Sequence, residues 1–200
     1  MEDTPTSKLI VVAVLCSVFF FLALTLLEVI PEIPVDIDFK PFFIPLAFVA
    51  LVPLGKPTVA VGLGASLGEF LRDMLEGYEI DDPFGAVGYA VAFVLAGYVI
   101  HNRPLSKVRL SIAAVLAGFV QALSEAAAFL LFGEETLKIA IWSAAGNTVT
   151  HGLIMGAIPL VLIVPQLHGR IERYMGFAPR GREPQRIPGP AQVRPAQPAL

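Results

Sequence analysis

Residues 55–77 read GKPTVAVGLGASLGEFLRDMLEG, and this stretch decides how the rest of the chain is interpreted. Pro57 stands where a first helical residue can lack its N–H group, so a helix is expected to begin here. Ala60, Gly64 and Gly68 follow at steps of four and therefore share one face of that helix. Because small residues at this spacing let two helix backbones approach closely in a membrane, the stretch predicts a tightly packed membrane helix.

The same helix continues into three charged residues. Arg72 and Asp73 lie near its end, where they either mark the membrane surface or belong to a site. Glu69 lies one turn deeper, where an ionisable group is costly unless it has a partner. Glu69 is therefore expected to have a function.

The composition is that of a membrane protein. The chain has 200 residues, of which 56% are hydrophobic and 16% charged, and its mean hydropathy is +0.72. A soluble domain is usually about 25% charged. Cys16 is the only cysteine, which excludes a disulfide framework within the chain and a cysteine-based metal site. We expect a multi-pass protein of the cell membrane.

Apolar runs predict an all-α fold with six transmembrane helices, each near the ~20 residues that cross the hydrocarbon layer. The predicted spans are approximately 8–28, 39–55, 57–76, 84–101, 108–132 and 138–164. The second is the shortest, and its two prolines predict a kink or a partly interfacial position. The chain then divides into a cytoplasmic N-terminus (1–7), a transmembrane domain (8–165), an interfacial segment (166–177) and a disordered tail rich in Pro and Arg (178–200).

The basic residues predict the orientation, because cytoplasmic loops carry an excess of Lys and Arg. With both termini cytoplasmic, the outer side receives only three of the 14 basic residues, Lys40, Arg72 and Lys138. The inner side receives Lys8, Lys56, Arg103, Lys107, Arg109, Arg170, Arg173, Arg180, Arg182, Arg186 and Arg194.

Two of the predicted outer connections are acidic, and two interpretations stay open. They are ordinary solvated loops, or they are lids over an outward-facing site that favours cationic or neutral solutes. The acidic residues are Glu28, Glu32, Asp36 and Asp38 in the first connection, and Asp73, Glu76, Glu79, Asp81 and Asp82 in the third.

A set of polar side chains within the spans forms the candidate binding site. Pairs four apart share a helix face, and their positions place most of the set between the midplane and the outer surface. Two carboxylates facing lipid would be costly, so they should face inward and meet a ligand, water or partners. Trp142 would stack on a ring of the ligand. The candidate residues are Glu69, Gln121, Glu125, Trp142, Asn147 and His151.

Several kinds of chemistry have no signature in this sequence. No Gly-rich loop leads to a Lys for nucleotide phosphates, and there is no His-Glu-x-x-His pair or Gly-x-Ser-x-Gly elbow. The basic residues near 103–109 lack interleaved aromatic residues, so a nucleic-acid surface is not expected. We therefore expect no cofactor and no metal, and any ATP use must come from a partner.

The arrangement resembles the substrate-capture (S) components of energy-coupling factor (ECF) vitamin transporters over about residues 8–165. The resemblance rests on six predicted spans with both ends inside, a long first outer loop, and two motifs. These motifs are GLGASLGEFLRD at 62–73 in the third span and GNTVTHG at 146–152 in the sixth.

The resemblance implies a binding subunit without enzymatic activity. Such proteins capture a vitamin or related small molecule near the outer face, then associate with a membrane scaffold subunit and two ATPases. The contact with the scaffold often uses a pair of small residues on the first helix, which here would be Ala13 and Ser17.

Two alternatives belong to other classes. One is an intramembrane enzyme that uses Glu125 and His151 as an acid/base pair. The other is a structural membrane subunit without a ligand, in which the polar set only joins helices.

Overall fold

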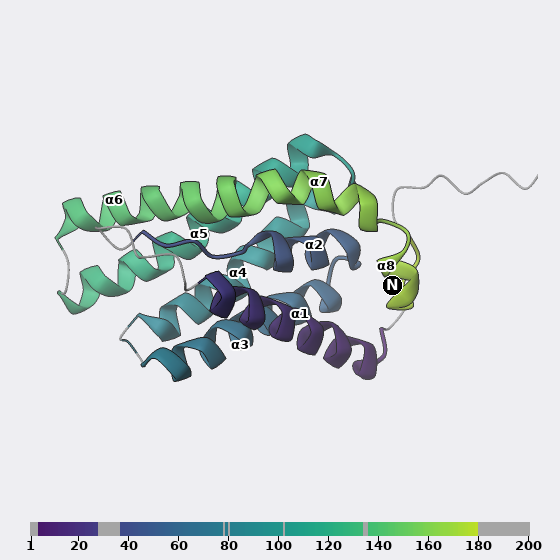
Figure 1. Ribbon diagram of the computed structural model, residues 1–200, viewed down its shortest axis with the longest axis horizontal. Helices are drawn as coiled ribbons and strands as arrows, with labels where there is room; N and C mark the ends of the chain where they lie inside the picture. Colours follow the sequence, from purple (N-terminus) through teal and green to yellow (C-terminus); the bar gives the residue numbers. More distant parts are fainter. Residues whose placement is uncertain are drawn as a thin grey trace, which may run out of the picture.

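The structure is a computed structural model, and it describes residues 4–27, 37–77, 79, 81–101, 103–133 and 136–179. The predicted first outer loop and the tail beyond residue 179 therefore lie largely outside the described residues. Figure 1 shows the elements as a bundle of helices along one long axis. They are α1 (Thr6–Leu27), α2 (Phe43–Leu51), α3 (Lys56–Glu76), α4 (Asp82–Ile100), α5 (Lys107–Phe132), α6 (Leu137–Asn147), a π-helix η1 (Thr148–Ala157), α7 (Ile158–Leu167) and α8 (Ile171–Tyr174).

The described helices are apolar on the outside and polar in places on the inside. Among them, four are long and apolar enough to cross a membrane: α1, α4, α5 and the 31-residue helix Leu137–Leu167. Large side chains such as Phe19 and Leu63 are exposed, whereas Gln121 and His151 are fully buried. This distribution is compatible with a membrane protein, in which polar groups turn towards the bundle interior.

Helices α1 and α3 run parallel and touch through their backbones. A Cβ atom added at Gly64 would collide with the Ala13 carbonyl oxygen, and one at Gly68 would lie 2.8 Å from the Ser17 carbonyl oxygen. The predicted small face of α3 is thus used inside this chain. Ala13 and Ser17, the residues expected to dock the scaffold, pack against α3 in this chain, and Ser17 is only 3% exposed.

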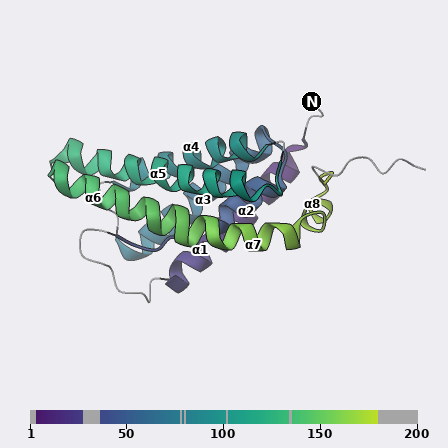
Figure 2. The same cartoon turned by 90° about the horizontal axis from the view of Figure 1, so that it is seen from above.

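The remaining long helices alternate in direction. Ser66 of α3 donates to the Ala86 carbonyl of α4, and Ser124 of α5 donates to the Phe84 carbonyl. Gly118 of α5 packs on Gly152 of η1. These pairs make α4 antiparallel to α3, α5 antiparallel to α4, and the last long helix antiparallel to α5. Figure 2 shows α6 and α7 in line along α5.

The π-helix in the last long helix has a local cause. Thr148 donates its hydroxyl to the Ala144 carbonyl at 2.6 Å, and Thr150 contacts the carbonyls of Gly146 and Asn147. Hydroxyl groups that bond to carbonyls of the preceding turn compete with the backbone ladder and bend or widen a helix. The wider segment holds His151 in the interior.

The predicted second span, 39–55, for which two prolines predicted a kink or a partly interfacial position, is not a continuous helix. Helix α2 has only nine residues, about 13 Å of rise, and residues 38–41 before it are not helical. Figure 1 shows this preceding stretch passing along α6 before it joins α2. Fully stretched, residues 37–42 add at most about 20 Å, so stretch and helix together match a ~30 Å hydrocarbon layer. Irregular backbone at such depth is tolerated where protein surrounds it.

The two described ends of the chain meet at one end of the bundle. Lys8 at the start of α1 donates to the Gly176 carbonyl at 2.8 Å, and its ammonium lies 5.6 Å from the ring centroid of Phe177. Met175 and Phe177 are buried in the apolar core. The segment after α7 therefore folds back over this end of the bundle.

Candidate functional site: an acidic cavity around Lys40

A cavity of about 190 Å³ opens at the end of the bundle opposite α8. It lies where α1 and α3 end, α4 begins and α5 approaches its last turns. Its apolar wall includes Leu24, Leu27 and Phe129, and the rest of its lining is mostly charged. The fold thus gathers charged side chains from several helices at one site.

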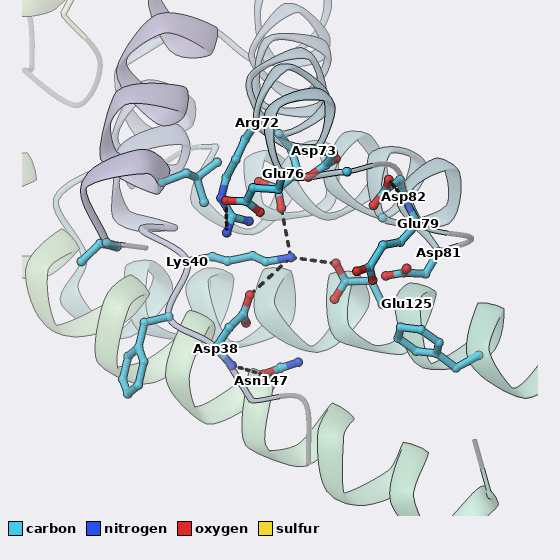
Figure 3. A pocket seen from close by; sticks show the side chains of 17 residues that line it. Asp38, Lys40, Arg72, Asp73, Glu76, Glu79, Asp81, Asp82, Glu125 and Asn147 are labelled. Carbon is cyan, nitrogen blue, oxygen red and sulfur yellow. Dashed lines mark hydrogen bonds and ion pairs between the residues drawn. The ribbon is translucent and has the colours of Figure 1, made fainter. Parts of the chain in front are cut away.

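The centre of the site is the ammonium group of Lys40, from the non-helical stretch before α2. Its Nζ lies 2.9 Å from Glu125 Oε1, 3.0 Å from Glu69 Oε1 and 3.6 Å from Asp38 Oδ2. Figure 3 shows these interactions converging on Lys40. The ammonium also lies 5.7 Å from the ring centroid of Tyr89, within the range of a cation–π contact. One cation therefore joins α3, α5 and the stretch before α2.

Lys40 was missed as a site residue because it was counted only as a basic charge of the outer side, although it lies at the start of the predicted span 39–55. Its neighbours could have revealed it, because Lys40 stands alone among Phe39, Pro41 and Phe42 at the start of an apolar run. Two carboxylates predicted within the membrane also required a positive partner. Counting charges across the predicted spans would have pointed to this lysine.

A second polar chain leads from Asp38 into the core. His151 Nε2 lies 2.5 Å from Asp38 Oδ1, and Nδ1 lies 3.3 Å from the Gln121 side-chain amide. The Asp38 N–H donates to Asn147 Oδ1 at 3.2 Å. The Gln121 atom in contact with Nδ1 is the amide oxygen Oε1, an acceptor, so this contact needs a proton on Nδ1 unless the amide is turned to present its NH₂ group. Together these contacts hold the backbone at Asp38 in place.

The rim of the cavity adds further negative charge. Arg72 Nη2 pairs with Glu76 Oε1 at 2.7 Å, and the Glu79 N–H donates to Asp82. Burial raises the pKa of Asp81 to about 6, so this carboxyl is still mostly ionised at pH 7. In all, the lining carries two cations, Lys40 and Arg72, and eight carboxyl groups: Asp38, Glu69, Asp73, Glu76, Glu79, Asp81, Asp82 and Glu125.

The structure brings five of the six predicted site residues into one connected network. Glu69, Glu125 and Asn147 line the cavity, while Gln121 and His151 lie behind Asp38. The expected position of Trp142 is corrected, because its side chain is 63% exposed and does not line the cavity. Trp142 is therefore not placed to stack on a ligand there.

The pair expected for an intramembrane enzyme has separate partners. Glu125 bonds to Lys40, whereas His151 bonds to Asp38 and Gln121. Within the part of the chain that the structure describes, no group of three or more His, Cys, Asp or Glu residues is arranged to hold a metal ion. The contacts of the site are those of ion pairs and hydrogen bonds around a charged cavity.

No protein-family model, curated protein or solved structure matches this chain. The resemblance to S components thus rests on the motifs quoted from the sequence. The function has to be argued from the cavity itself.

Proposed function

We propose that this protein is a membrane-embedded capture subunit of an ATP-driven importer of the ECF type. It takes up a vitamin or related small molecule and is not an enzyme. The observation that carries the proposal is the charged cavity at one end of an apolar bundle. At about 190 Å³, the cavity is smaller than the ~300–1,000 Å³ pockets that hold drug-sized ligands, so it suits a small solute.

The proposed topology has six crossings of the cell membrane with both ends in the cytoplasm. The alternating directions of the long helices support this topology. Helices α1 and α3 run parallel, so residues 37–51, which lie between them in the sequence, bring the chain back to the side where α1 began. The contact between Lys8 and Gly176 supports a common side for the two ends. With the basic residues on the cytoplasmic side, the cavity faces outward.

Cysteine labelling tests this topology. In a Cys16→Ala background, a cysteine at Glu79 should react with a membrane-impermeant thiol reagent added to intact cells, because this position lines the outward cavity. A cysteine at Ser106, the N-cap of α5 at the other end, should react only after the cells are opened. Labelling in the reverse pattern would contradict the orientation.

The capture role predicts binding without independent transport. The purified chain should retain a small molecule that mass spectrometry identifies, and liposomes containing only this chain should not concentrate that molecule. Concentration should require a scaffold subunit and two ATPases, because the sequence has no loop for nucleotide phosphates.

Two outcomes would contradict this role. Uptake against a gradient by the chain alone, driven by protons or sodium ions, would identify a secondary transporter. A chain that retains no small molecule and binds none would favour the structural alternative, in which Lys40 and its carboxylates only join helices.

A further inference from the structure

The cavity holds more negative charge than its own cations balance. Arg72 neutralises Glu76, and the single charge of Lys40 is shared by Asp38, Glu69 and Glu125. Among the described residues, the remaining lining carboxylates make no ion pair. These are Asp73, Glu79, Asp81 and Asp82. Figure 3 shows Asp38 and Asn147 on one side of Lys40, and these four on the other.

A second observation is independent of this charge count. Glu69 is only 5% exposed, and its Oε1 accepts from Lys40, yet its Oε2 has no hydrogen-bond partner among the described residues. Asp81 Oδ1 is also buried without a partner. A buried acceptor without a donor costs free energy, more so when it is charged. Both residues line the cavity, so a ligand in the cavity could supply the missing hydrogen-bond donor.

We propose that the solute captured in this cavity is a small organic cation with an ammonium or guanidinium group. This inference rests on the proposed capture function and names its substrate class. The cationic group binds Glu69 Oε2 and the rim carboxylates beside Lys40, and the carbon part of the solute packs on Leu24, Leu27 and Phe129. An ammonium supplies three donors and a guanidinium five, which suits a site rich in acceptors.

The other ligand classes fit this site less well. An anion would enter a cavity with an excess of carboxylates, and a neutral solute would leave that excess unbalanced. A bare divalent cation requires several converging ligands, and the described residues contain no such group. Lys40 itself shows that an ammonium is accepted by the carboxylates of this cavity at hydrogen-bonding distance.

A charge series on the unchanged protein tests the proposal. Putrescine carries two ammonium groups on a four-carbon chain, butanediol is its neutral counterpart, and succinate is its anionic counterpart of similar length. Putrescine should bind the detergent-solubilised protein in calorimetry and raise its melting temperature. Butanediol and succinate should do neither, and added salt should weaken the binding of putrescine.

A variant pair locates the binding. Glu69→Gln keeps the shape of the side chain but removes its charge, so it should weaken putrescine binding about 10-fold or more. Trp142→Phe, on the exposed surface away from the cavity, should leave the affinity unchanged. If Glu69→Gln does not fold, the charge series on the unchanged protein decides.

The possible results separate this inference from the capture function. The proposal of an organic cation is overturned by any of three results. Putrescine fails to bind, butanediol or succinate binds equally well, or Mg²⁺ binds in preference to putrescine. A co-purified solute without a cationic group also contradicts the organic cation, but it supports the capture function. If putrescine binds as expected but the chain alone concentrates solute, the cation inference stands and the ATP-coupled function fails.

Discussion

Replacing Lys40 by methionine should destabilise the protein by about 3–5 kcal/mol, the usual cost of removing one partner from a buried ion pair. Methionine has a similar length and fits an apolar environment, but it leaves Asp38, Glu69 and Glu125 without their shared cation. Since Lys40 joins α3, α5 and the stretch before α2, the loss should loosen all three. The free energy of unfolding in detergent, followed by denaturant titration, measures the effect.

Two further variants show whether charge is the cause. Lys40→Arg keeps the positive charge and should be less destabilising than Lys40→Met. Adding Glu125→Gln to Lys40→Met removes one uncompensated carboxylate and should recover part of the lost stability. If Lys40→Met unfolds at the same denaturant concentration as the unchanged protein, the carboxylates do not need this cation, and the charge argument fails.

The second large effect is expected at the contact between α1 and α3. Gly64→Leu places a side chain where even a Cβ atom would collide with the Ala13 backbone, and backbone atoms cannot move aside by changing rotamer. Overpacking usually costs about 1–3 kcal/mol, and a collision with backbone should lie at or above this range. The yield of monodisperse protein and its melting temperature should both fall.

Leu63→Phe provides the matched control for this substitution. Leu63 precedes Gly64 on the same helix, but its side chain is 58% exposed. A larger apolar side chain there should change stability by no more than about 0.5 kcal/mol. Equal stability of Gly64→Leu and Leu63→Phe would show that the close contact of α1 and α3 is not required.

The sequence predicted most helices because long apolar runs leave few alternatives. The predicted spans 84–101 and 108–132 correspond to Asp82–Ile100 and Lys107–Phe132, and 57–76 corresponds to Lys56–Glu76. The predicted span 39–55 is only partly helical, because an apolar run indicates that residues are buried but does not specify their backbone conformation. Most of residues 40–51 are buried by their neighbours, so they need no continuous helix to protect their backbone.

The candidate site was predictable where polar groups lie inside apolar helices. Glu69 and Glu125 were found because ionisable groups at such positions need partners. The partner itself, Lys40, was counted only as a basic residue of the outer side when the orientation was predicted. Trp142 was misplaced because an aromatic residue in an apolar helix faces lipid or protein equally well. The contact of Ala13 and Ser17 with α3 was not predicted, because spacing does not tell whether a small face meets the same chain or another.

The position of Lys40 on a non-helical stretch has a consequence for biosynthesis. A nine-residue helix preceded by a charged, irregular segment is too short to be a stable membrane span by itself. Besides Asp38 in the same stretch, its lysine pairs with Glu69 of α3 and Glu125 of α5, which are synthesised later. The ion pairs of Lys40 can therefore be completed only after α5 has been synthesised, so residues 37–51, α3 and α5 reach their final packing together.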